Sequence, residues 1–188
     1  EFIEAYYGSA GPQIHAWLDY THDKAERENI HMGCYESPSS ALFSGGFFSF
    51  ADSLWDAAEL AVEGQPEYLE RVKASRLSPK YAWLARDIND KAYIVDQVSG
   101  TVDVNRDYLQ RLDDFCAECE GFGIKFLNEK GLALDSFRDG ILATVESKDI
   151  VALDAVSVSD PSPGIMWKYF GSGWNDSPLF SASQASSE

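Results

Sequence analysis

Helical periodicity dominates this sequence and sets the strongest limit on its fold. Apolar residues recur at three- and four-residue steps in successive stretches, and no two-residue alternation of comparable strength occurs before Val151. One stretch, for example, places Ile14, Trp17 and Leu18 on a single helix face. Because a helix buries its apolar stripe against other helices, the sequence predicts an all-α fold, an antiparallel bundle of about five to six helices.

Glycine and proline mark the first helix boundaries. Pro12 suits the first turn of a helix that ends in the polar residues 27–29. Helical spacing is lost after this helix, so the residues that follow are predicted to form a long loop. It returns at Phe50, and Gly64 is a natural C-terminal stop.

The stripe that begins at Pro66 is the longest in the sequence. It continues in phase past Pro79 as far as Val95, and Gly100 follows. Because the phase is kept, we expect one helix kinked at Pro79 rather than two separate helices.

Two further helices are expected before residue 146. Asn105 suits the N-cap of the first, which stops at Gly121, and a shorter one covers residues 133–145. We therefore expect residues 1 to 146 to be mostly helical, with no sheet of more than two strands.

The character of the chain changes after Asp149. Residues 151–158 alternate weakly, the Asp-Pro-Ser-Pro-Gly run at 160–164 breaks the pattern, and residues 165–170 suit a strand. We expect two parts: a helical domain over residues 1–149, and over 150–188 a linker and the start of a following β-rich accessory module, or a disordered tail.

The charge balance limits the partners. Fifteen Lys and Arg stand against thirty-one Asp and Glu, so the net charge is 15 − 31 = −16. Such a surface repels phosphate backbones, which argues against nucleic acid as a partner. No run reaches the roughly 18 apolar residues that a membrane span needs, so no membrane insertion is expected. The chain opens at Glu1 within an amphipathic pattern, which suggests a piece of a longer protein.

Two segments carry a resemblance to a known family. They are Glu1-Phe2-Ile3-Glu4-Ala5-Tyr6-Tyr7-Gly8, followed by Ala10, Pro12, Ile14, Leu18 and His22-Asp23, and Pro66-Glu67-Tyr68-Leu69-Glu70-Arg71-Val72. They resemble the region after the barrel in an uncharacterised bacterial domain-of-unknown-function family, which is similar to the alpha-glucuronidase and beta-hexosaminidase-like glycoside hydrolases. The resemblance covers roughly residues 1 to 90, and helical layout alone extends it to about 145.

A third segment resembles the opening strand of the β-rich accessory modules that such enzymes carry. It is Pro163-Gly164-Ile165-Met166-Trp167-Lys168-Tyr169-Phe170, followed by Trp174 and Leu179-Phe180. Phe170 stands where those modules usually have a second tyrosine, and the acidic residue expected next is absent.

The resemblance implies a non-catalytic role for this chain. In such enzymes the catalytic carboxylates lie at the strand ends of a (β/α)₈ barrel, and this chain has no alternating strand–helix units. The barrel would then precede Glu1, and no catalytic residue is carried over. The expected partner is that barrel, in a secreted, periplasmic or cell-surface glycoside hydrolase, and no cofactor is implied.

The best candidate binding residues lie in an aromatic loop over residues 34–48. Aromatic rings stack on the apolar faces of sugars, and a carboxylate accepts hydrogen bonds from sugar hydroxyls. The competing interpretation is that the aromatics fill the bundle core or cover the missing barrel. The candidates are Tyr35, Glu36, Phe43, Phe47, Phe48 and the neighbouring Trp55.

Three function hypotheses follow. The first is a helical module that packs on its barrel, possesses no activity alone and lines the glycan site. If the barrel is removed, an exposed apolar patch is expected at Tyr6, Tyr7, Phe43, Phe47, Phe48 and Trp55. The second is a carbohydrate-binding module acting through the aromatic loop, and the third is a stand-alone acidic helical interaction domain.

Cysteine and histidine spacing offers only a weak metal candidate. Cys116 and Cys119 form a CxxC pair, and His31 and Cys34 have the same offset. Because both cysteines of the first pair are in phase with an apolar stripe, burial as small hydrophobic residues is the favoured interpretation, and no metal site is predicted.

Overall fold

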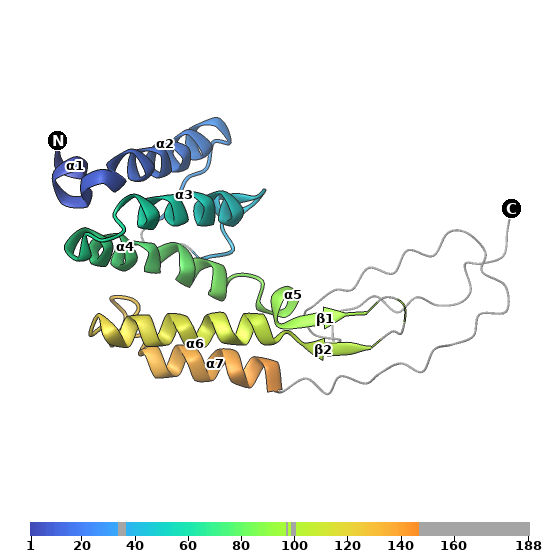
Figure 1. Cartoon of the computed structure of the whole chain (residues 1–188). Helices are drawn as coiled ribbons and strands as arrows, with labels where there is room; N and C mark the ends of the chain where they lie inside the picture. Colours follow the sequence, from blue (N-terminus) through green and yellow to red (C-terminus); the bar gives the residue numbers. More distant parts are fainter. Residues whose placement is uncertain (34–36, 97, 99–100, 147–188) are drawn as a thin grey trace, which may run out of the picture.

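Five long helices lie side by side in chain order and form an antiparallel bundle, which confirms the predicted fold class (Figure 1). The structure is a computed structural model that describes residues 1–33, 37–96, 98 and 101–146. Each long helix packs against the next one along the chain. They are α2 (Gly11–Arg27), α3 (Phe47–Ala61), α4 (Pro66–Ala85), α6 (Arg106–Gly121) and α7 (Leu134–Glu146).

Short elements connect and extend this bundle. They are α1 (Phe2–Tyr7), the 3₁₀ turns η1 (Gly8–Ala10) and η2 (Ala41–Phe43), the five-residue helix α5 (Ile88–Ala92), and the strands β1 (Tyr93–Val95) and β2 (Val102–Val104). The two strands form an antiparallel hairpin with Tyr93 opposite Val104. The hairpin extends from the end of the bundle at which α6 begins (Figure 1).

The core consists of two clusters of buried residues that share α4. The N-terminal cluster is small and comprises Ala10, Ile14, Ala51, Trp55, Ala58, Val62 and Val72. The C-terminal cluster comprises Leu77, Leu84, Ala92, Tyr108, Leu112, Phe115, Cys116, Cys119, Leu134, Phe137, Ile141 and Val145. The first half of α4 therefore contributes to one cluster and the second half to the other.

The helix expected from Phe50 begins three residues earlier, at Phe47. Gly46 precedes it with φ 80°, a left-handed conformation that suits glycine and turns the chain into the helix. Phe47 itself is buried, and packing of its ring supplies the reason for the earlier start. The predicted loop is correspondingly shorter, and the candidates Phe47 and Phe48 lie on a helix rather than on a loop.

The long helix predicted past Pro79 to Val95 is only partly correct. Helix α4 does run through Pro79 as one helix, but it ends at Ala85. Arg86 is extended and Asp87 has φ 48°, so the chain leaves the helix there and re-enters a helical turn only at α5.

The hairpin replaces the last part of that predicted helix. β-branched residues such as Val95 and Val102 favour a pleated backbone. The sheet has two strands, so the expected upper limit holds for the described part of residues 1 to 146.

The two later helices agree with their predicted boundaries to within a residue. Asn105 is the N-cap of α6, and its side-chain oxygen accepts hydrogen bonds from the backbone N–H groups of Asp107 (3.1 Å) and Tyr108 (3.4 Å). Residues 150–188, predicted as a linker and further module, lie outside the described residues. Within the described ranges, no helix combines the length and apolarity that crossing a bilayer requires.

Candidate functional site

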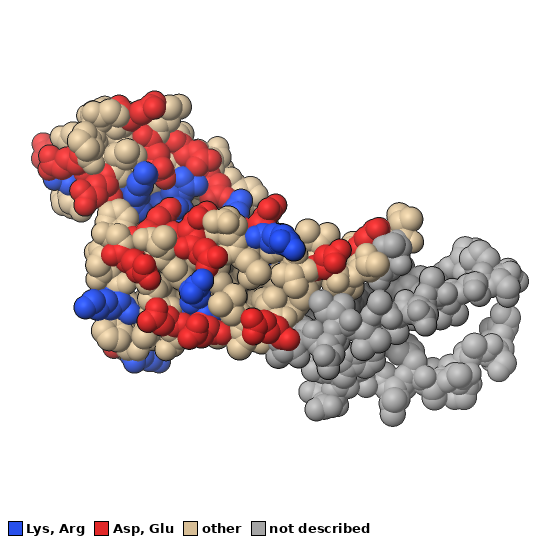
Figure 2. All heavy atoms as spheres, turned by 60° about the horizontal axis from the view of Figure 1, so that its bottom comes forward, with Lys and Arg blue, Asp and Glu red and all other residues tan. Residues whose placement is uncertain are grey.

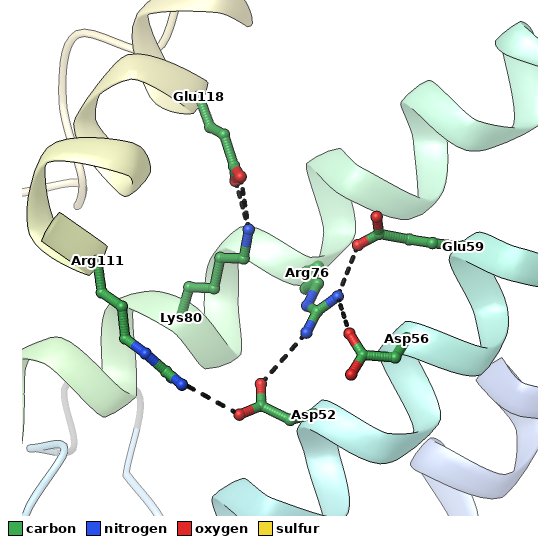
Figure 3. A network of polar contacts seen from close by, with 7 residues as sticks. All are labelled: Asp52, Asp56, Glu59, Arg76, Lys80, Arg111 and Glu118. Carbon is green, nitrogen blue, oxygen red and sulfur yellow. Dashed lines mark hydrogen bonds and ion pairs between the residues drawn. The ribbon is translucent and has the colours of Figure 1, made fainter. Parts of the chain in front are cut away.

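A groove of about 360 Å³ lies over α4 and is walled by α3 and α6. It lies where the two core clusters meet, because α3 belongs to the N-terminal cluster and α6 to the C-terminal cluster. Charged side chains from all three helices line it and point toward one another (Figure 3). Acidic side chains are scattered in patches over the molecular face shown in Figure 2, with fewer basic side chains between them.

Arg76 of α4 is the central residue of the groove. One guanidinium nitrogen, Nη1, lies 2.7 Å from both Asp56 Oδ1 and Glu59 Oε1, and Nη2 lies 3.3 Å from Asp52 Oδ1 (Figure 3). The three carboxylates occur at positions i, i+4 and i+7 of α3, so they share one helix face. The side chain of Arg76 is 12% exposed.

The electrostatics of this cluster favour a charged guanidinium. Burial acts against the charge on Arg76, but hydrogen bonds to Glu59 and Asp56 outweigh it and raise the pKa of Arg76 above its ordinary value. The Nε–H of Arg76 is buried and has no hydrogen-bond partner among the described residues. The groove therefore keeps one buried donor that an oxygen atom would satisfy.

The α6 side of the groove is tied to both other helices. Lys80 Nζ of α4 lies 2.6 and 2.7 Å from the two carboxylate oxygens of Glu118. Arg111 Nη1 lies 3.8 Å from Asp52 Oδ2 and so links α6 to α3 (Figure 3). Helices α3 and α6, which are distant in the sequence, are thus joined across α4 by polar contacts.

Aromatic rings form the other part of the groove lining. Phe48 and Trp83 are half-buried there. The guanidinium carbon of Arg111 lies 4.7 Å from the centre of the Trp83 ring, and Lys91 Nζ lies 4.8 Å from the same ring and 5.8 Å from that of Phe48.

Lys91 caps the C-terminal end of α4, close to the ring of Trp83. Its ammonium group donates hydrogen bonds to the backbone oxygens of Trp83 and Arg86, where α4 ends. Burial lowers the pKa of Lys91 to about 8.

Four of the carboxylates of the groove face cationic side chains. Five carboxylates and three cationic groups line the groove, together with the rings of Phe48, Trp83 and Phe115. Hydrolysis of a glycosidic bond needs two carboxyl groups on opposite sides of that bond. Here Asp52, Asp56 and Glu59 come from one helix and converge on Arg76, which leaves them committed to ion pairs.

The predicted binding residues are divided between the core and the surface. Phe47 and Trp55 are only 1% and 3% exposed, and each ring makes a T-shaped contact with the ring of Trp17. They are not accessible to a sugar ring. Phe43 is half-buried and stacks on Phe48, with ring centres 5.9 Å apart. Tyr35 and Glu36 lie outside the described residues. Of the four candidates that the structure describes, Phe48 alone lines the groove.

The cysteines and histidine considered for a metal behave differently from one another. Cys116 and Cys119 are buried on α6, and burial raises the pKa of both thiols, that of Cys119 to about 11. His31 is exposed and lies 3.2 Å from Asn29 Oδ1, and Cys34 lies outside the described residues. Over the described ranges, no three His, Cys, Asp or Glu side chains come together in a way that could hold a metal ion.

The ion-pair residues of the groove are absent from the sequence-based candidates. The spacing of Asp52, Asp56 and Glu59 is visible in the sequence, but such a stripe is usually the solvated face of a helix. Only the packing of α3 on α4 places Arg76 against it. No family model, curated protein or solved structure matches the chain.

Proposed function

We propose that this chain is a non-catalytic helical module of a secreted glycoside hydrolase, and that it packs on a (β/α)₈ catalytic barrel absent from the chain. The parent protein would act outside the cytoplasm, in the periplasm or at the cell surface. The proposal begins from the resemblance of residues 1 to 90 to the region after the barrel in such enzymes. It needs a surface on this chain that suits a partner domain.

The observation that carries the proposal is an exposed aromatic pair on α1. Phe2 is 74% exposed and Tyr6 is 40% exposed, and their rings stack with centres 5.6 Å apart. The Arg71 guanidinium of α4 lies 4.7 Å from the Tyr6 ring and donates to the Tyr6 backbone oxygen at 2.9 Å, so it holds the ring in place. An ordered, exposed pair of large rings is typical of a surface that another domain covers.

The expected position of the docking patch changes in one respect. Tyr6 was expected to line it and is exposed, whereas Phe47 and Trp55 are buried in the bundle. The patch that supports packing on a barrel is therefore the outer face of α1, and the expected set of six aromatic residues does not form one surface.

Two measurements on the chain alone test this function. We expect no turnover of aryl-glycosides, because Asp52, Asp56 and Glu59 on the α3 wall of the groove are paired with Arg76, and Glu118 on the α6 wall is paired with Lys80. We also expect weak, concentration-dependent self-association in sedimentation velocity, which the double variant Phe2→Ser/Tyr6→Ser removes. Leu60→Ser, which changes an exposed apolar residue on α3, is the matched control and should leave association unchanged.

Turnover that survives repurification would overturn the non-catalytic role. A monomeric chain whose behaviour the double variant does not alter would remove the support for a docking face on α1. Sequence upstream of Glu1 provides an independent test, since a barrel encoded in the same reading frame is expected.

A second candidate function is carbohydrate binding, and the groove is the observation that favours it. Phe48 and Trp83 offer rings, and the charged side chains around Arg76 offer both donors and acceptors to hydroxyl groups. The predicted aromatic-loop site would then shift from residues 34–48 to the groove, with Phe48 common to both.

Calorimetry against a panel of polysaccharides separates this candidate from the first. If the groove binds a glycan, Phe48→Ala reduces affinity at least tenfold. Phe50→Ala, which removes an exposed ring of α3 that does not line the groove, leaves affinity unchanged. If no polysaccharide gives a measurable heat of binding, the carbohydrate-binding function is eliminated. The proposed packing on a barrel would be unaffected by that result.

A further inference from the structure

The ion pairs of the groove leave it rich in hydrogen-bond acceptors. All three cationic side chains of the lining are already paired with carboxylates of the same groove. The lining contains two more carboxylates than cations, so its formal net charge is −2. The carboxylates belong to Asp52, Asp56, Glu59, Asp114 and Glu118, and the cations to Arg76, Lys80 and Arg111.

Asp114 of α6 is the carboxylate of the groove that no cation neutralises. Among the described residues it forms no ion pair, and its Oδ1 accepts a hydrogen bond from Gln110 Nε2 at 2.8 Å. The residue is exposed and lines the groove. Its other oxygen, Oδ2, is therefore left to accept a hydrogen bond from a ligand, and its negative charge acts on whatever enters the groove.

The groove also keeps a donor for a ligand. The Nε–H of Arg76 is buried and has no hydrogen-bond partner within the part of the chain that the structure describes. Three carboxylates of α3 surround the same guanidinium (Figure 3). An anion that approached Nε would meet these carboxylates, whereas a hydroxyl group carries no charge.

A hydroxyl group satisfies both needs of the groove. It accepts one hydrogen bond, as the Nε–H of Arg76 requires, and it donates one, as Asp114 requires. An ionised carboxyl or sulfate group only accepts, so it leaves Asp114 without a donor and adds a negative charge to a lining that is already negative.

We propose that the groove binds uncharged glycans and excludes acidic ones, and that Asp114 determines this selectivity. The inference rests on the second candidate function, carbohydrate binding in the groove. It adds the class of glycan: polymers of neutral sugars bind, whereas polymers of uronic acids are repelled.

Calorimetry with pairs of polysaccharides that share a sugar skeleton and differ in charge tests the selectivity. Galactan with polygalacturonate and mannan with polymannuronate are two such pairs in the panel. At low ionic strength the neutral member should bind at least tenfold more tightly than the acidic one. In about 1 M salt, where the Debye length is about 3 Å, the preference should fall below threefold, because the cause is electrostatic.

The variant Asp114→Asn separates the role of this residue from the overall charge of the chain. It should lower the preference for the neutral member at least threefold at low ionic strength. The matched control Asp19→Asn removes the same charge from an exposed position on α2, which forms no wall of the groove, and should leave the preference unchanged. Each preference is a ratio of two affinities of one protein, so partial unfolding of a variant does not alter it.

Two results would overturn the selectivity and leave carbohydrate binding in place. One is a polyuronate that binds as tightly as its neutral counterpart, and the other is an equal change of preference in the two variants. If no polysaccharide of either kind binds, this inference and the second candidate function fail together. None of these results bears on packing through Phe2 and Tyr6, which sedimentation velocity tests separately.

Discussion

The two halves of the bundle bury different kinds of side chain. The N-terminal cluster around α3 contains three alanines, and several of its large rings, such as Trp17 and Tyr68, are only partly buried. The C-terminal cluster around α6 buries whole large side chains, among them Tyr108, Leu112 and Phe115. Because stability follows the apolar area removed from water, the C-terminal half is expected to be the more stable one.

The two halves also differ in whether their buried polar groups have hydrogen-bond partners. In the C-terminal half, Tyr108 Oη donates to Leu84 O at 2.8 Å, so the buried hydroxyl is satisfied. In the N-terminal half, Trp55 Nε1 is buried without a hydrogen-bond partner among the described residues. The half with the smaller core also presents the exposed Phe2 and Tyr6. This difference is what the proposed packing of another domain on the N-terminal half would require.

Truncation of core residues should show the largest difference between the halves. Phe115→Ala, in the C-terminal cluster, should lower the free energy of unfolding by about 3–5 kcal/mol, because it removes a fully buried ring. Val72→Ala, in the N-terminal cluster, should cost about 2 kcal/mol, since it removes two methyl groups. Urea denaturation of both variants measures the difference, and equal losses would contradict the comparison.

Substitution of Arg76, which lies in the groove where the two halves meet, should lower the free energy of unfolding by an intermediate amount. Arg76→Gln removes the guanidinium that three carboxylates share and should cost about 1.5–3 kcal/mol, the range for hydrogen bonds to charged groups. The control is Arg138→Gln, which breaks the exposed pair with Asp113 inside the C-terminal half and should leave the urea midpoint nearly unchanged. If Arg138→Gln lowers the urea midpoint more than Arg76→Gln does, the ion pairs of the groove do not stabilise the junction of the two halves.

Alkaline pH should weaken the C-terminal half through Tyr108. Burial raises the pKa of Tyr108 from 10 to about 12. The unfolded chain therefore loses this proton first as pH rises, so stability is fully present below pH 10 and falls between pH 10 and 12, by roughly 2 kcal/mol. Urea midpoints of the wild type and Tyr108→Phe at pH 9 and 11.5 measure this, and parallel behaviour of the two proteins would rule out the contribution.

Local rules account for most of the element boundaries that the sequence predicted. Asn105 caps α6 because its side-chain oxygen reaches the first free N–H groups, an interaction within a few residues. The same rules failed at the hairpin. There the apolar stripe of α4 continues in phase to Ile88 and Val95, although Ile88 belongs to the separate short helix α5 and Val95 to strand β1.

The sequence by itself determined the helical class, the burial of the α6 cysteines and the acidic surface, because periodicity, side-chain type and charge are properties of single segments. Tertiary structure decided which aromatic side chains stay exposed and which residues form the groove. Phe47 and Phe48 are neighbours with the same chemistry, yet α3 directs one ring into the core and the other toward the groove. Arg76 acquired its three carboxylate partners only because α3 and α4 pack together, and that packing depends on the whole bundle rather than on any local pattern.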